Sequence, residues 1–171
     1  MSRLINPYIR RREEILLTGV AKRIYRFIHP DVATFFALLS SITAFILYLY
    51  VDGDPSNYLW CCLPIVAHYF WDGVDGKIAL LRQLNRKHGW LIDKISDYIC
   101  SCFFVAGFFS AATRSVYVVV VLLGLTTVIH VAYTYCYLKR DMDVKIGGTE
   151  SRIVLIVLNV LVWIKTLLCT S

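Results

Sequence analysis

Long apolar blocks alternate with short polar segments along most of the chain. Five blocks of 17 to 24 residues cover approximately 32–51, 57–76, 97–113, 115–138 and 152–170. A helix of about 20 residues crosses the hydrocarbon core of a bilayer, so each block is long enough to span a membrane. The pattern therefore predicts an all-α fold: a polytopic membrane helix bundle over 32–170, with about five to six membrane-spanning helices.

The first 28 residues have a different pattern. They contain the charged runs RRREE and KRIYR, with apolar residues between them. This arrangement is typical of an amphipathic helix that lies on the membrane surface, so residues 1–28 are predicted to form an interfacial helix. A solvated basic tail is the alternative. No secretory signal is evident at the N-terminus, and we expect one domain over residues 1–171.

The composition agrees with a membrane protein, because 58% of the residues are hydrophobic and 18% are charged. Five antiparallel spans would place sixteen of the eighteen lysines and arginines on one side, leaving Arg114 and Lys165 on the other. Cytoplasmic loops carry this excess, so the basic side is expected to be cytoplasmic. The net charge of +6 suits anionic lipid headgroups or an anionic substrate. Nucleic acid is not expected, because the basic residues flank spans.

Four aspartates lie where the second and third blocks meet. Asp72 and Asp75 are three residues apart, and Asp93 and Asp97 are four apart, so each pair shares one face of a helix. The two blocks are antiparallel neighbours joined by a short loop, and the pairs are therefore expected to meet near the membrane surface. An alternative is that they are helix-end charges, with Asp93 and Asp97 in a first turn.

Four clustered carboxylates repel one another and need positive compensation. Lys77, Arg82 and Lys94 are near in sequence and supply part of it. One or two divalent cations would supply more, and oxygen ligands favour magnesium, manganese or calcium over zinc. Gly76 and Gly89 each remove a side chain beside a carboxylate, which lets a phosphate-bearing ligand approach the backbone.

This spacing resembles the signature of the CDP-alcohol phosphatidyltransferase family, D-x-x-D-G-x-x-A-R, about eight residues, then G-x-x-x-D-x-x-x-D. The chain has Asp72, Asp75, Gly76 and Ala79, then LRQLNRKH, then Gly89, Asp93 and Asp97. HPDVAT at 29–34 also looks like the family's start of the first span. Two departures are clear: Leu80 stands where the motif has arginine, and five spans are counted where the family usually has six.

The resemblance implies an integral membrane enzyme of phospholipid synthesis, usually a homodimer, with its active site at the cytoplasmic face. It would transfer a phosphatidyl group from CDP-diacylglycerol to a polar alcohol and release CMP. Two Mg²⁺ or Mn²⁺ ions would be bound by Asp72, Asp75 and Asp93, with Asp97 sharing one and acting as the general base. The nucleotide-binding set implied by the motif is Asp31, Thr34, Asp75, Gly76, Ala79 and Gly89.

A basic segment, KRDMDVKIGGTESR, faces the same side as the aspartates. Its cations are candidates for an acceptor pocket that suits a phosphorylated alcohol, such as glycerol phosphate or inositol phosphate: Lys139, Arg140, Lys145 and Arg152. Ordinary positive-inside charge is the other interpretation.

Three other functions remain open. A CDP-alcohol donor would transfer its phosphoalcohol to diacylglycerol. A non-catalytic membrane relative would keep the fold after losing the motif arginine at Leu80. A divalent-cation transporter would need polar groups deep in several spans, whereas the charges here stop at one face.

Overall fold

The computed structural model describes residues 7–51, 57–84, 89–139 and 148–170, and these form six helices with no strand among them. The helices are α1 (Pro7–Ile24), α2 (Pro30–Leu49), α3 (Asn57–Leu81), α4 (Gly89–Thr113), α5 (Val116–Lys139) and α6 (Gly148–Thr170). The all-α class predicted from the apolar blocks is confirmed.

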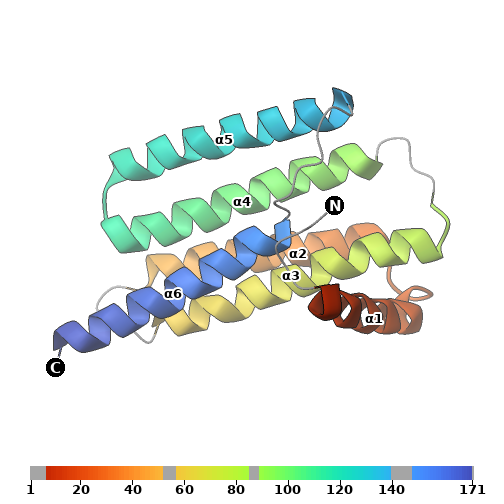
Figure 1. Cartoon of the computed structure of the whole chain (residues 1–171), viewed down its shortest axis with the longest axis horizontal. Coiled ribbons are helices and arrows are strands. Elements are labelled where there is room, and N and C mark those ends of the chain that lie inside the picture. The colour runs from red at the N-terminus through yellow and green to blue at the C-terminus, as the bar shows by residue number, and fades with distance from the viewer. Residues whose placement is uncertain (1–6, 52–56, 85–88, 140–147, 171) are drawn as a thin grey trace.

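Helices α2, α3 and α4 form the centre of the molecule (Figure 1), because α2 packs against both α3 and α4. Helix α5 lies along α4 and helix α6 lies along α3. The short α1 packs against α3. Consecutive long helices run in opposite directions, so the C-terminal half of α3 lies beside the N-terminal parts of α4 and α6.

The larger core cluster fills the space between α2, α3 and α4, with α6 packed onto it. Tyr48, Ile65 and Phe104 are among its buried members, and Leu155 and Val162 of α6 pack against it. Tyr48 makes edge-on ring contacts with Tyr58 and Phe108, a geometry that aromatic pairs prefer. This cluster holds the four helices in register.

A glycine allows α2 and α4 to approach closely. A Cβ atom added at Gly107 would lie 2.6 Å from Cδ2 of Tyr48 and 3.2 Å from the backbone Cα of Phe45. Any larger residue would therefore force these helices apart. The glycine acts here through its missing side chain rather than through backbone freedom.

A second, smaller cluster fixes α1 on α3. Leu17 and Ala21 of α1 are buried together with Val74 and Ile78 of α3. Arg82 adds a polar contact, because its Nε donates to the carbonyl oxygen of Tyr25 at 2.6 Å. Helix α1 is thus packed onto the part of α3 that carries the first two aspartates.

Two helix boundaries differ from the predicted blocks. Helix α3 continues to Leu81, where amides of Gln83 and Leu84 donate to the carbonyls of Leu80 and Ala79, with Gln83 at a φ of 52°. These are the two bonds of a Schellman cap. Helix α4 begins at Gly89 and has no acidic residue in its first turn, so the alternative that Asp93 and Asp97 are helix-end charges in a first turn is wrong.

In the part of the chain that the structure describes, two helical segments are long and apolar enough to cross a membrane, Pro30–Leu49 and Ile92–Thr113, and the segment Val116–Ala132 is apolar but shorter. The other predicted spans, and the placing of α1 on a membrane surface, stay predictions. Helix α1 does carry two large apolar side chains that do not face α3, since Ile15 and Leu16 are 63% and 69% exposed.

Candidate metal centre and its surroundings

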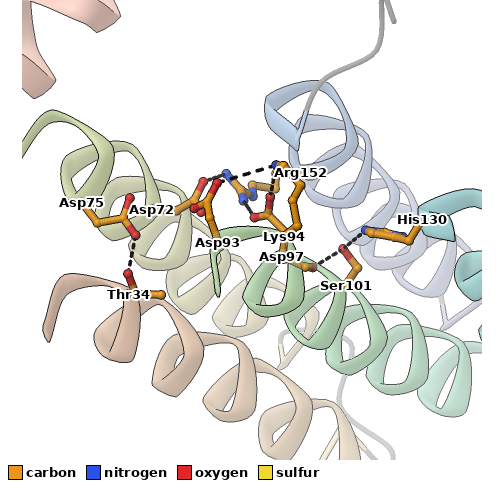
Figure 2. A network of polar contacts seen from close by, with 9 residues as sticks. All are labelled: Thr34, Asp72, Asp75, Asp93, Lys94, Asp97, Ser101, His130 and Arg152. Atoms are coloured by element: carbon orange, nitrogen blue, oxygen red, sulfur yellow. Dashed lines mark hydrogen bonds and ion pairs between the residues drawn. The ribbon is translucent and has the colours of Figure 1, made fainter. Parts of the chain in front are cut away.

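Three carboxylates from two helices meet at one end of the bundle. Asp72 and Asp75 are on α3 and Asp93 is on α4, and one oxygen from each lies within 4.8 Å of the others. We call these three residues the carboxylate cluster; Figure 2 shows them side by side. The spacing along each helix explains the meeting, because residues three apart on α3 lie on the same face. The predicted encounter of the pairs is confirmed for these three aspartates.

Asp97 lies one turn beyond Asp93 on α4 and is held by two cations. Nζ of Lys94 is 3.0 Å from Oδ2 of Asp97, and Nη2 of Arg152 is 3.7 Å from its Oδ1. Lys94 also lies 3.7 Å from Oδ2 of Asp93. The carboxylate of Asp97 is therefore beside the cluster and is fixed by charge (Figure 2).

Arg152 brings a third helix to the site. It lies near the start of α6, and its Nη1 is 2.7 Å from Oδ2 of Asp72. With the contact to Asp97, the guanidinium bridges α3, α4 and α6. Its planar fork of donors suits two carboxylates in this way. Arg152 is the predicted acceptor-binding residue whose side chain the structure describes, and it lies against the aspartates.

The structure says less about the other three predicted acceptor residues. Lys139 is the last residue of α5. Arg140 and Lys145 lie outside the described residues. The acceptor role of these three stays a prediction.

Helix α2 reaches the cluster through Thr34. The Thr34 hydroxyl donates to Oδ2 of Asp75 at 2.7 Å. Asp75 is 6% exposed and so is the most buried of the described aspartates. A buried carboxylate needs hydrogen-bond donors, and Thr34 supplies one. Thr34 was predicted to bind nucleotide; in this structure it orients a predicted metal ligand.

The remaining predicted nucleotide-binding residues lie around this end of the bundle. Asp31 lies two residues after the N-cap His29 of α2, and its carboxylate is 3.2 Å from Nδ1 of that histidine. Gly76 has open space beside it, since an added Cβ would meet nothing within 4 Å. Ala79 caps α3 through its carbonyl, and Gly89 begins α4. The space at Gly76 is compatible with a ligand beside Asp75.

A further polar chain, which the sequence did not indicate, extends from Asp97 to α5. The Ser101 hydroxyl donates to the Asp97 carbonyl at 2.8 Å and lies 3.5 Å from Nε2 of His130. Nδ1 of His130 donates to the Thr126 carbonyl at 3.0 Å. The spacing of Asp97 and Ser101, one helical turn, is the signal that would have placed them together.

The carboxylate cluster fits a divalent cation. Its donors are all carboxylate oxygens, which hard cations such as Mg²⁺ and Mn²⁺ prefer. They come from two helices packed against the same core, and they are close enough to share one ion. Zinc sites typically use nitrogen and sulfur donors from histidine and cysteine, whereas all three donors of this cluster are carboxylate oxygens.

Comparison with known families identifies the chain. The family model for CDP-alcohol phosphatidyltransferase matches residues 27–170. Searches of curated proteins and of solved structures found no match. The match covers most of the chain, which therefore belongs to the CDP-alcohol phosphatidyltransferase family, as the spacing of its aspartates indicated. Members are membrane-associated phosphotransferases of phospholipid synthesis that use a CDP-linked donor, an alcohol acceptor and divalent metals.

Proposed function

We propose that this protein transfers a phosphatidyl group from CDP-diacylglycerol to a polar alcohol and releases CMP, in a metal-dependent reaction at the cytoplasmic membrane face. The observation that carries the proposal is the convergence of three carboxylates from α3 and α4 within 4.8 Å, with Asp97 one turn away. No other described group of three or more acidic, cysteine or histidine side chains is close enough to hold a metal.

The proposed division of work follows from the contacts. Asp72, Asp75 and Asp93 would hold the divalent ions, and Asp97, one helical turn after Asp93 on α4, would share one. A metal held by these residues would supply positive charge that offsets the charge of the diphosphate. Asp97 takes the proton from the acceptor hydroxyl as the general base. Lys94 and Arg152 keep its carboxylate in position.

The helices around the cluster suggest where the two substrates bind. The nucleotide is proposed to lie beside Asp31, Thr34, Gly76, Ala79 and Gly89, where an added Cβ at Gly76 would find open space. The acceptor is proposed to lie toward α6, where Arg152 is already among the carboxylates. A cation there suits an acceptor that carries phosphate, such as glycerol phosphate or inositol phosphate. We expect a homodimer, as is usual in the family.

One observation favours a second candidate, the non-catalytic relative. Leu80 stands in place of the motif arginine and is 74% exposed. Arg82, two residues later, donates to the Tyr25 carbonyl at 2.6 Å and so serves the packing of α1. Lys94 and Arg152 are nevertheless cations beside the aspartates. They would supply the positive charge that is missing because position 80 is leucine instead of the motif arginine. The enzyme is therefore the leading proposal.

The test is CMP release by the purified protein in detergent. CDP-diacylglycerol is offered with glycerol phosphate, inositol phosphate, inositol or serine, each with Mg²⁺, with Mn²⁺ and with chelator. Release that depends on one acceptor and on metal is expected. CMP release from a CDP-alcohol with diacylglycerol would reassign the donor. No release under any condition would contradict catalysis and leave the non-catalytic relative.

A further inference from the structure

Arg152 places a cation among the carboxylates that would bind metal. Its side chain is only 11% exposed, and its Nη1 lies 2.7 Å from Oδ2 of Asp72. Asp72 is a member of the carboxylate cluster. One predicted metal ligand is therefore already bound by a positive group of the protein itself.

The partners of the other ligands differ. Asp75 accepts from the neutral hydroxyl of Thr34. Asp93 has Lys94 at 3.7 Å, but the ammonium is closer to Asp97, at 3.0 Å. Among the described contacts, Asp72 is the cluster member with a cation at hydrogen-bond distance. Competition between metal and protein is thus concentrated on Asp72.

A divalent ion and the guanidinium of Arg152 oppose each other at this position. Both need the negative charge of Asp72, and two positive groups a few ångströms apart repel strongly where water is partly excluded. Without metal, Arg152 offsets the mutual repulsion of the carboxylates. With metal, this compensation is no longer needed.

We propose that Arg152 is a resident counter-cation that competes with the divalent ion for Asp72, and that metal binding releases its guanidinium to bind the phosphate of the acceptor. This inference rests on the proposed function and deepens it, because it sets an order: metal binds first and the anionic acceptor second. Linkage makes the effect reciprocal, so Arg152 weakens metal binding by the same factor by which metal weakens its contact with Asp72.

The experiment measures Mn²⁺ binding by the full chain in detergent, from the electron paramagnetic resonance signal of free Mn²⁺. R152Q removes the competitor and is expected to bind Mn²⁺ about tenfold more tightly. This is the change in affinity that corresponds to the free energy of one charge-assisted hydrogen bond. R152K keeps the charge without the fork and is expected to lie between R152Q and the wild type. R82Q is the matched control, since it removes an arginine that bonds the Tyr25 carbonyl. Its Mn²⁺ affinity should be close to wild type.

A second readout follows the release itself. Mn²⁺ should increase amide hydrogen exchange in the first turns of α6 in the wild type and leave it unchanged in R152Q. Elution volume and thermal unfolding establish that each variant is folded; if R152Q is not, R152K decides. Mn²⁺ affinity that is equal to or weaker than that of the wild type in folded R152Q and R152K overturns the competition. No Mn²⁺ binding by the wild type overturns it as well, together with the metal site of the proposed function.

Discussion

The polar groups at one end of the bundle and those in its middle are held in opposite ways. In the middle, the amide of Asn159 on α6 donates to the Tyr48 hydroxyl on α2 at 2.6 Å and to the Leu155 carbonyl at 2.8 Å. Asn159 and Tyr48 are 0% and 1% exposed. At the end, ionised side chains bridge three helices and stay partly exposed: Arg152 has 11% exposure and Asp93 49%.

The two regions differ in role: the polar groups in the middle hold helices together, and the charged groups at the end are those proposed for catalysis. A neutral hydrogen bond in a dry interior joins two helices without a charge to neutralise. The charged end has the opposite property, because its carboxylates and cations can exchange partners with ions and substrates from water. Variants at the two regions should therefore fail in different assays.

The largest effect is expected at the charged end. Asp75→Asn keeps the size of the side chain but removes the charge of a proposed metal ligand. Transfer activity should fall by about 10²–10³-fold, as it does when one group that stabilises developing charge is lost. The rate of CMP release and the thermal unfolding temperature are measured together. If Asp75→Asn failed to fold, rather than folding without activity, Asp75 would belong with the groups that hold the helices together.

Gly107→Ala should act on stability. The added Cβ would lie 2.6 Å from Tyr48 and 3.2 Å from the backbone of Phe45, so α2 and α4 must separate. Overpacking of this kind costs about 1–3 kcal/mol in free energy of unfolding. Gly124→Ala on α5 is the control, because its Cβ would meet nothing within 4 Å. Equal unfolding temperatures for both variants would contradict the close approach.

Thr34→Val tests whether the hydroxyl orients Asp75. It removes the 2.7 Å donor and changes the side chain little in size. Loss of a group that orients a metal ligand typically costs about 10–100-fold in metal affinity or activity, and we expect the lower value. Thr43→Val is the control on the same helix, since its hydroxyl bonds the Leu39 carbonyl. Unchanged Mn²⁺ affinity in Thr34→Val would separate Thr34 from the metal centre.

The smallest effect is expected in the middle of the bundle. Asn159→Leu removes the bond to Tyr48, and interhelical hydrogen bonds in membrane proteins average about 0.6 kcal/mol. The free energy of unfolding should fall slightly, while CMP release per folded molecule stays the same. A double-mutant cycle with Tyr48→Phe isolates the pair. A large loss of activity would mean that the middle of the bundle takes part in catalysis.

Much of the charged end could be predicted from the sequence because it depends on local spacing. Asp72 and Asp75, and Asp93 and Asp97, share helix faces by their separation alone, and two antiparallel helices bring the faces together. Helix ends were less predictable. Gln83 closes α3 at a φ of 52° without the glycine that usually marks such a cap, so the sequence offered no sign that α3 continues to Leu81.

The contacts of α6 could not be predicted, because they depend on how one helix sits against another. Arg152 and Asp72 are 80 residues apart, and Asn159 and Tyr48 are 111 apart. Apolar periodicity tells which residues lie in a helix but not which residue of a partner helix each one meets. The sequence alone indicates Arg152 as a phosphate contact. Its ion pairs with Asp72 and Asp97 depend on how α6 packs against α3 and α4.

Asp97→Asn tests the central claim most directly: that the carboxylate cluster binds metal while Asp97 performs the proton transfer. Mn²⁺ binding and CMP release are measured on the same preparation of folded protein in detergent. Mn²⁺ is expected to bind as before, and CMP release is expected to fall by about 10²–10⁴-fold, which is the contribution of a general base. Normal turnover by Asp97→Asn would contradict the assignment of Asp97 as the base.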